Sequence, residues 1–296
     1  MRVLITGAGG FVGHYVLRKL AAIYPKAKLT LISNSEVSES YSSIRYDRNS
    51  GRINLEDDSL SCDIIIHAGS FTPKNGAMAN DAVGAISNIN FTQELLRVTD
   101  LKSLKKVIFL STLDVYDSDF VIDENTSVKP ATLYGLSKLF CENIIEYACV
   151  DHNISHLIIR VGHVYGPGEQ QYQKLIPACM KNMLRGEPVV VHGEGEDLRC
   201  FIHVENIAEA VVTSLAKHFE FNVVNAVSST PFSVMEIIEK IGLISGLDYK
   251  VKHVNKNKIR RDYLFDDARF VENFAIEHRD FERSLIEEFD FMRSIS

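Results

Sequence analysis

Short apolar runs alternate with amphipathic helical patterns along most of the chain. The runs RVLIT, KLTLIS, CDIIIHA, KKVIFLS, HLIIRVGHVYG and FNVVNA are apolar almost throughout, as in strands that are buried on both faces. Between them, HYVLRKLAAIY, YGLSKLFCENIIEYA and VENIAEAVVTSLAKH repeat apolar residues at helical spacing. The alternation predicts an α/β fold, with a doubly wound parallel sheet covered by helices on both faces.

The alternation lapses after residue 162, where GPGEQQ, RGEPVVVHGEGEDLRC and KVKHVNKNKIRRD interrupt it. We expect a smaller mixed α/β domain there, built from pieces that return to the first sheet in between. The predicted division is 1–161 and 204–225 for the domain of the large sheet, and 162–203 and 226–296 for the smaller domain. A chain of 296 residues is long enough for both.

Gly7, Gly10 and Gly13 follow the first predicted strand and open the first predicted helix. Glycines there allow a tight turn and a close backbone approach, and a helix N-terminus offers free N–H groups to a pyrophosphate. This context favours a dinucleotide-binding, Rossmann-type sheet over a glycine turn without a ligand. The phosphate-loop pattern GxxxxGK[ST] does not occur in the sequence.

The second predicted strand ends in LISNSEV, with Ser33, Asn34 and Ser35 at the place where many such folds carry an acidic residue. Glu36 comes late for that role. Without a carboxylate on the ribose hydroxyls of NAD, a 2′-phosphate is not repelled. The sequence therefore favours NADP(H) over NAD(H) and leaves both open, with Arg45 as a distant candidate for a phosphate contact.

Composition mainly excludes classes of partner. The net charge of −7 argues against nucleic acid. No apolar run approaches the ~18–20 residues of a membrane span, and MRVLITGAGG turns to glycine too early for a secretory signal. The five cysteines are spread without a CxxC motif, which is typical of reduced, buried thiols. We expect a cytoplasmic protein with no metal site and no membrane partner.

Tyr15, Tyr24 and Tyr134 each stand four residues before a lysine. Only Tyr134 has a strand end rich in hydroxyls, STLDVYD, as a neighbour, and ligands of open α/β sheets bind at the carboxyl ends of strands. On a helix, Tyr134 and Lys138 face the same way. A nearby ammonium, and an oxidised nicotinamide when present, are expected to lower the tyrosine pKa from ~10. The pair is therefore interpreted as a proton carrier rather than as core packing.

With these features in place, the chain resembles the extended short-chain dehydrogenases/reductases, the NAD(P)-dependent epimerases, dehydratases and reductases of sugar nucleotides. The matching segments are TGAGGFVG, DIIIHAGS, NINFTQELL, STLDVYD, YGLSK, RVGHVYGPG and GEGEDLRCFIHVENIAEAV. They run nearly end to end. The chain departs from the family pattern at Gly69, where alanine is usual, at Phe91, where glycine is usual, and at His163, where asparagine is usual.

The resemblance implies an enzyme in which Tyr134 is the general acid/base, Lys138 its partner and Thr112 the hydroxyl that orients the sugar oxygen. It implies cofactor contacts from Gly7, Gly10, Phe11, Val12, Gly13, Asn34, Asn54, Leu55, Ala68, Gly69, Tyr134 and Lys138. It also places a nucleotide-sugar substrate beside Phe71, Thr72, Thr112, His163, Arg199 and Arg261. In that arrangement the arginines would bind the diphosphate, and His163 would donate a hydrogen bond near it.

Dehydratases of this family carry Thr-Asp-Glu where this chain has Thr112, Leu113 and Asp114, and leucine cannot protonate a leaving hydroxyl. A dehydratase is therefore disfavoured. Because the absent ribose-binding carboxylate fits an exchangeable NADPH better than a tightly held NAD, we expect a NAD(P)H-dependent reductase of a 4-keto-6-deoxy sugar nucleotide, such as dTDP-4-keto-6-deoxyhexose, for deoxysugar and surface-polysaccharide biosynthesis. The alternative is a NAD-dependent sugar-nucleotide 4-epimerase. A hypothesis from another class is an NADP-sensing protein without turnover. The helix at 91–99 and the helix after Tyr134 correspond to those that relatives use to dimerise, so a homodimer is expected.

Overall fold

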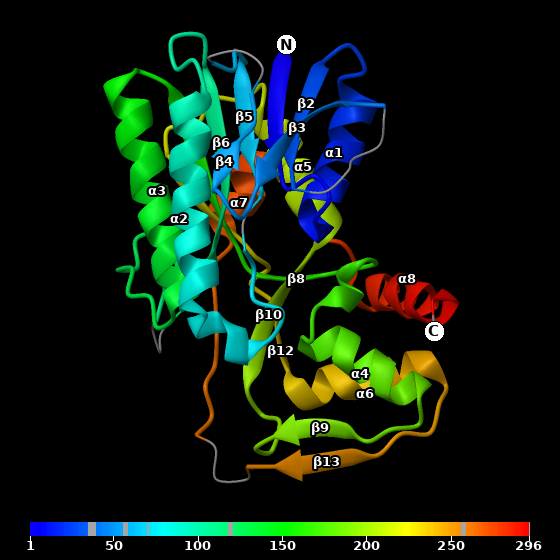
Figure 1. Cartoon of the computed structure of the whole chain (residues 1–296). Helices are drawn as coiled ribbons and strands as arrows, with labels where there is room; N and C mark the ends of the chain where they lie inside the picture. Colours follow the sequence, from blue (N-terminus) through cyan, green and yellow to red (C-terminus); the bar gives the residue numbers. More distant parts are fainter. Residues whose placement is uncertain (35–39, 56–58, 70, 118–120, 256–258, 296) are drawn as a thin grey trace.

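The computed structural model consists of a large sheet with helices on both faces and a smaller α/β part beside the carboxyl ends of its strands (Figure 1). It describes residues 1–34, 40–55, 59–69, 71–117, 121–255 and 259–295. The strands of the large sheet are β1 (Arg2–Thr6), β2 (Lys28–Ser33), β3 (Ser42–Asp47), β4 (Arg52–Ile53), β5 (Ile64–His67), β6 (Lys106–Thr112), β7 (Ser155–Val161) and β11 (Val223–Ala226).

These eight strands lie in the order β11-β7-β6-β5-β1-β2-β3-β4, and only the β3–β4 pair is antiparallel. The chain order reverses between β1 and β5, because β2 and β3 extend the sheet on one side of β1 and β5, β6 and β7 extend it on the other. In open α/β sheets a crevice for ligands forms at this reversal, outside the carboxyl ends of the strands.

Two apolar clusters cover the two faces of the large sheet, and Figure 1 shows helices on both of these faces. On one face pack α1 (Phe11–Ile23), α5 (Val204–Ser214) and α7 (Ala268–Phe274). On the other pack α2 (Ala82–Val98) and α3 (Leu133–Asp151). The expected Rossmann-type, doubly wound sheet is confirmed, and its all-apolar strands follow from burial on both faces.

The smaller part has its own core, formed where α4 (Leu175–Leu184), α6 (Val234–Ser245) and α8 (Phe281–Ser294) pack together. Its strands β8 (His163–Tyr165), β10 (Leu198–His203) and β12 (Pro231–Ser233) form a three-stranded sheet in the order β12-β10-β8. A second pair joins β9 (Val189–His192) to β13 (Val251–Val254). Three short 3₁₀ helices complete the fold: η1 (Gly76–Asn80), η2 (Leu113–Val115) and η3 (Glu169–Gln171).

One predicted element is wrong. The pattern of HLIIRVGHVYG predicts one strand, but the run forms β7 in the large sheet and β8 in the small one. The break falls at Gly162, where an added Cβ would lie 3.0 Å from both Leu113 and Val227 side chains. The chain therefore changes sheets at a residue that has no room for a side chain.

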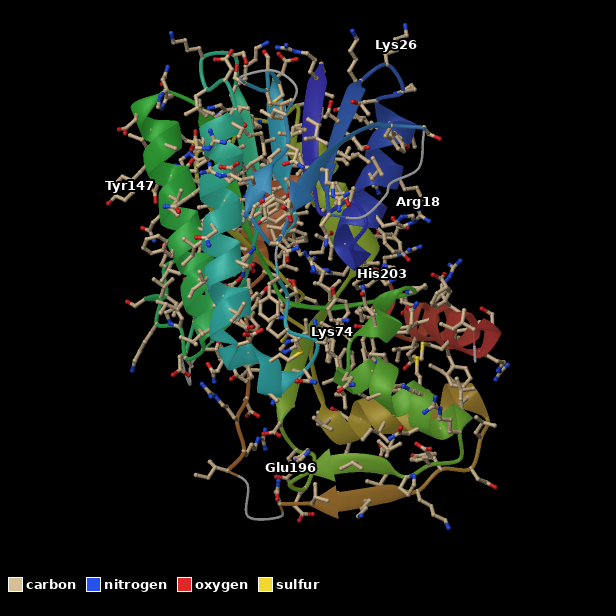
Figure 2. The ribbon with its side chains drawn as sticks, in the orientation of Figure 1. Arg18, Lys26, Lys74, Tyr147, Glu196 and His203 are labelled. Carbon is tan, nitrogen blue, oxygen red and sulfur yellow. The ribbon has the colours of Figure 1, made fainter. Side chains whose placement is uncertain are left out.

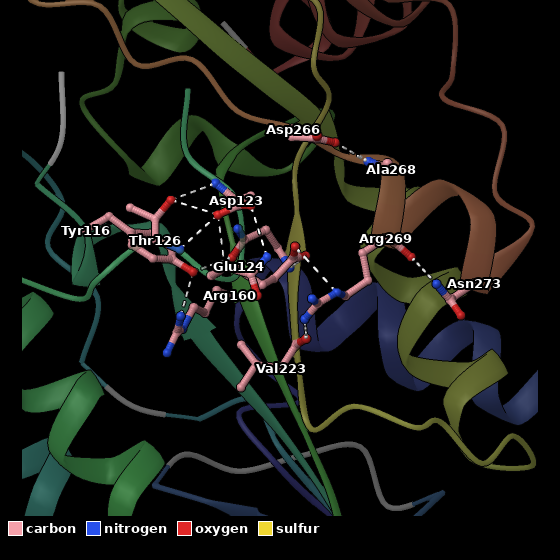
Figure 3. A network of polar contacts seen from close by, with 12 residues as sticks. Tyr116, Asp123, Glu124, Thr126, Arg160, Val223, Asp266, Ala268, Arg269 and Asn273 are labelled. Atoms are coloured by element: carbon pink, nitrogen blue, oxygen red, sulfur yellow. Dashed lines mark hydrogen bonds and ion pairs between the residues drawn. The ribbon is translucent and has the colours of Figure 1, made fainter. Parts of the chain in front are cut away.

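The domain boundaries stay a prediction, but one observation bears on the C-terminal part. Helix α7 falls in the segment 226–296, yet Phe270 and Phe274 belong to the core cluster of the large sheet. A polar network holds the same helix, since Arg269 pairs with Glu124 at 3.6 Å and donates to the Val223 carbonyl at 3.1 Å (Figure 3). The chain thus returns to the large sheet before it ends in α8.

Side chains at the junction between the two parts include Lys74 and His203, whereas Lys26 and Glu196 lie at opposite ends of the molecule (Figure 2). All five cysteines are buried, as expected. None of the helices that the structure describes is both long and apolar enough to cross a bilayer.

Candidate active site

The glycine turn joins β1 to α1 in a conformation that only glycine adopts easily. Gly7 has a φ of +74°, and Gly10 N–H donates to its carbonyl at 2.9 Å. A Cβ on Gly13 would lie 2.0 Å from the Gly7 oxygen, so any side chain there would push helix and strand apart. Gly9 has no heavy atom within 4 Å of its missing Cβ and faces the cavity described below. The turn therefore presents a bare backbone and a helix N-terminus, which suits a pyrophosphate.

The end of β5 lies against the glycine turn, which explains the segment DIIIHAGS. A Cβ on Gly7 would lie 2.5 Å from Gly69, so the two backbones touch. Beneath them, His67 bonds Thr6 at 2.7 Å and Thr92 at 3.0 Å, and Thr6 accepts a hydrogen bond from Gly69 N–H at 2.8 Å. Burial lowers the pKa of His67 to about 3. This neutral ring therefore fixes the turn rather than carrying protons.

Tyr134, in the first turn of α3, lies at the carboxyl end of β6. Its hydroxyl makes hydrogen bonds with Thr72 and Thr112. Burial raises the pKa of Tyr134 well above its usual value, and the Asp114 carboxylate adds to that effect. The expected lowering of this pKa by a neighbouring ammonium is therefore wrong for the protein alone, because desolvation of the phenolate outweighs both hydrogen bonds.

Lys138 lies one helical turn after Tyr134 and is 3% exposed. Its Nζ donates to the Leu110 carbonyl at 2.6 Å and lies 4.1 Å from the centre of the Phe109 ring. Burial lowers the pKa of Lys138 to about 8, against the effects of Cys141 and Glu142. The side chain thus lies along β6 beneath the place where Tyr134 meets the threonines.

Asn88 of α2 holds the loop that carries Thr72. Its Oδ1 accepts from Phe71 N–H at 2.7 Å, and its Nδ2 donates to Phe71 O at 3.3 Å and to Ser137 Oγ at 3.1 Å. The Phe71 ring packs edge-on against Tyr134, with ring centres 6.4 Å apart. Asn88 therefore ties the loop to α3, which brings Thr72 to the Tyr134 hydroxyl.

The smaller part contributes His163 and Arg199 to the opposite wall. The His163 ring bonds the Cys200 backbone, and its Nδ1 is buried with no partner among the described residues. Burial first, then Lys174 and Arg199, lower the pKa of His163 to about 3. A neutral ring that donates to Cys200 leaves Nδ1 as an acceptor. The expected hydrogen bond from His163 to a phosphate stays a prediction; in this tautomer Nδ1 accepts from a hydroxyl or an amide N–H.

Arg199 lies over the Tyr263 ring at 4.9 Å and donates from Nη1 to the carbonyls of Leu198 at 2.7 Å and Arg261 at 2.6 Å. These contacts fix the guanidinium at the cavity wall. Arg261, by contrast, does not line the cavity, because its side chain pairs with Asp117.

All these groups surround one cavity of about 1060 Å³ between the two parts of the molecule. The predicted site residues that line it are Gly7, Gly10, Phe11, Val12, Gly13, Asn34, Ala68, Gly69, Phe71, Thr72, Thr112, Tyr134, Lys138, His163 and Arg199. Asn54 and Leu55 do not line it. Asn54 N–H bonds Arg45 O beside β3, and Leu55 packs on the core beneath the sheet.

The cavity is also lined by charged residues that the sequence analysis did not identify as binding residues, among them Arg48, Lys174 and Glu169. Lys174 is the N-cap of α4 and lies 5.0 Å from the Tyr172 ring centre. Asp114 also lines the cavity, and enclosure by its walls raises the pKa of Asp114 while Lys174 opposes that rise. The sequence shows that Lys174 stands near the start of a helix and that Asp114 follows a strand. It does not show that both residues line one cavity, because that depends on the fold.

Glu169 of η3 and Glu288 of α8 form a buried carboxyl pair, 2% and 1% exposed. The two side chains share a hydrogen bond, and Glu288 also accepts from Gly166 N–H at 3.0 Å. Burial raises the pKa of Glu169 well above its ordinary value and that of Glu288 to about 7. Because two buried carboxylates repel each other, the pair retains a proton into the neutral range.

Comparisons with known proteins agree with this geometry. A sequence model described as the NAD dependent epimerase/dehydratase family matches residues 3–226. The chain is 25% identical over 277 residues to a UDP-N-acetyl-alpha-D-glucosaminuronate decarboxylase of Bacillus cytotoxicus, covering 87% of this chain and 84% of that protein. It is 24% identical to a trifunctional UDP-glucose 4,6-dehydratase/UDP-4-keto-6-deoxy-D-glucose 3,5-epimerase/UDP-4-keto-L-rhamnose-reductase of Arabidopsis thaliana, covering 96% of this chain but only 46% of that longer protein.

Among solved structures, the fold matches a mutant UDP-glucuronic acid 4-epimerase from Bacillus cereus in complex with UDP-4-deoxy-4-fluoro-glucuronic acid and NAD. The TM-score is 0.87 at 21% identity, and the match covers 100% of both chains. At that identity the likeness concerns the fold.

Proposed function

The chain belongs to the NAD dependent epimerase/dehydratase family, and on this premise we propose that it is a nucleotide-sugar 4-epimerase. The observation that carries the proposal is the Tyr134 hydroxyl bonded to Thr72 and Thr112, with apolar Leu113 beside them. One proton carrier with an orienting hydroxyl suffices to oxidise and re-reduce a sugar carbon. An elimination of water needs a further acid at the place of Leu113.

In this proposal the glycine turn holds the dinucleotide, and Arg199 and the N-terminus of α4 face the substrate phosphates. A bound nicotinamide supplies the hydride acceptor and donor. Tyr134 takes the proton of the sugar hydroxyl and later returns it, while Thr112 holds the oxygen in line. The raised pKa of Tyr134 keeps the phenol protonated until a positive charge is bound beside it.

The 4-epimerase is favoured over the reductase expected from the sequence by two findings. The matching family is described by epimerases and dehydratases, and a 4-epimerase shares the fold over its whole length. A NADPH-dependent reductase is the second candidate. It is favoured by Ser33 and Asn34 at the end of β2, where no carboxylate takes the ribose hydroxyls and an exchangeable NADPH fits.

The test is to incubate the protein with UDP-glucose, UDP-N-acetylglucosamine or UDP-glucuronic acid and with NAD⁺ or NADP⁺, and to analyse the sugars by NMR. The expected result is the C4 epimer of one substrate with no net change in reduced-nicotinamide absorbance. Stoichiometric loss of that absorbance with dTDP-4-keto-6-deoxyglucose and NADPH would instead establish the reductase. Dinucleotide binding without turnover of any of these sugars would contradict both and support a sensing protein.

Tyr134→Phe tests the proton carrier itself. Since general acid/base catalysis contributes ~10²–10⁴-fold, kcat is expected to fall by at least about a hundredfold while the dinucleotide still binds. Tyr24→Phe is the matched control, because Tyr24 also precedes a lysine by four residues but lies outside the cavity. A Tyr134→Phe enzyme that keeps the rate of the Tyr24→Phe enzyme would exclude the assignment.

A further inference from the structure

The turn after β3 brings an arginine to the end of β2. Ser33 and Asn34 end that strand, next to the glycine turn because Ile32 pairs with Thr6 of β1. Arg48 comes from the turn after β3 and lines the same corner of the cavity as Ser33 and Asn34. Arg45, the candidate that the sequence suggested, pairs with Ser33 in the sheet; both arginines are exposed, but only Arg48 lines the cavity.

Arg48 is held by a neutral partner. With its amide oxygen turned towards the guanidinium, Asn34 accepts from Arg48 Nε at 2.7 Å and from Nη2 at 3.0 Å. This contact orients the guanidinium, and the amide, being neutral, does not compensate its charge. The Arg48 guanidinium is thus already positioned by Asn34, so its planar group loses little conformational freedom when it binds a ligand.

The carboxylate that precedes Arg48 in the chain is engaged within its own turn. Asp47 accepts hydrogen bonds from Asn49 N–H at 2.9 Å and Ser50 Oγ at 2.8 Å, within its own turn. Among the residues that the structure describes, no carboxylate forms an ion pair with Arg48. In a chain with a net charge of −7, an oriented arginine at the cavity wall provides a local positive charge that suits an anionic ligand.

We propose that Arg48, oriented by Asn34, binds the 2′-phosphate of the adenosine ribose and makes the protein selective for NADP(H). The end of β2 is where Rossmann folds contact that ribose, with a carboxylate for the 2′-hydroxyl or an arginine for the 2′-phosphate. Here the described residues at that place are a hydroxyl, an amide and a guanidinium. The inference rests on the proposed function only in requiring a dinucleotide on the glycine turn, because the 2′-phosphate is remote from the reacting carbon.

The test compares 2′,5′-ADP with 5′-ADP by isothermal titration calorimetry on the full-length protein. The two ligands differ only in the phosphate under test, and no turnover is involved. We expect 2′,5′-ADP to bind at least about tenfold more tightly, which corresponds to one good charge-assisted contact. Arg48→Gln is expected to abolish this preference while 5′-ADP affinity stays within about twofold. Arg45→Gln, with the same loss of charge outside the cavity, is the matched control and should keep the preference.

Three outcomes would overturn the inference. Equal affinity of the wild-type protein for both ligands would exclude a 2′-phosphate site. An equal loss of both ligands in Arg48→Gln would show that the guanidinium contacts the adenine instead. A preference for 5′-ADP that disappears in Glu36→Gln would show that the Glu36 carboxylate binds the ribose hydroxyls instead; Glu36 lies outside the described residues. If neither nucleotide nor NAD⁺ binds, the dinucleotide site itself, and with it the proposed function, is wrong.

Discussion

Gly135 determines how closely α3 can approach the end of β6. A Cβ at this position would lie 2.2 Å from the Asp114 carbonyl oxygen and 3.3 Å from the Pro130 side chain. Because the residue has no side chain, the first turn of α3 packs directly on η2. Tyr134 then reaches Thr112, and the hydrogen bond between them forms. The approach of Tyr134 to Thr112 therefore depends on a residue that does not itself line the cavity.

Gly135→Ala is expected to lower both stability and rate. Overpacking at a backbone contact costs about 1–3 kcal/mol, and a displacement of about 1 Å at a catalytic group costs about a hundredfold in rate. Urea unfolding and steady-state kinetics would measure the two effects. Gly76→Ala is the control, since no heavy atom of the described residues lies within 4 Å of its Cβ position. Equal stability and activity of the two variants would show that α3 and η2 are not in tight contact.

At this scale the sequence predicted which residue types meet, but not their electrostatics. Tyr134, Lys138 and Thr112 lie in one cavity, as the spacing and the strand end indicated. The direction of the shift in the Tyr134 pKa could not be predicted, since it depends on how completely α3 and the loop that carries Thr72 exclude water. Arg48 was also missed, because its place depends on the turn that returns the chain from β3.

At the scale of elements, long apolar or periodic segments were predictable and short ones were not. The predicted runs KLTLIS and RVLIT coincide with β2 and β1, and YGLSKLFCENIIEYA lies within α3. β4 has two residues and β8 and β12 have three each, so no periodicity can develop. The helix predicted at 91–99 is the second half of α2, whose start at Ala82 is set by the Asp81 cap on Val83 N–H.

Helix α6 begins with a reciprocal cap that can be tested in isolation. Ser233 Oγ accepts from Glu236 N–H at 3.1 Å, and the Glu236 carboxylate accepts from Ser233 N–H at 2.6 Å. Ser233→Ala is expected to lower the free energy of unfolding by about 1 kcal/mol, while Ser233→Thr, which keeps the oxygen, should lose much less. Chemical denaturation measures both. If the two variants lose the same amount, the side-chain cap is not what stabilises the helix start.

At the scale of the whole molecule, the cavity is lined by both parts, and the Glu169–Glu288 pair links α8 to the loop at its wall. Both pKa values are raised in the folded protein, so folding retains protons that the unfolded chain releases above about pH 4.5. The contribution of the pair to stability is therefore greatest at acidic pH. It is lost as the pH rises through about 7.

Glu288→Gln should flatten this dependence, because an amide keeps a hydrogen bond to Glu169 without titrating. Between pH 5 and 8 the wild-type free energy of unfolding is expected to fall by about 1–3 kcal/mol relative to the variant. Glu287→Gln, on the exposed side of the same helix, is the control. Parallel pH profiles for wild type and Glu288→Gln would mean that the pair does not share a proton.

The three-stranded sheet β12-β10-β8 also decides how the two walls can move. β8 follows β7, β12 follows β11, and β10 leads into α5, which packs on the large sheet, so each of the three neighbouring strands connects directly to the larger part. A joint of three adjacent connections bends about one axis and resists twisting. We therefore expect a bulky ligand to enter through a rocking motion about this line, which would separate Arg199 from Tyr134.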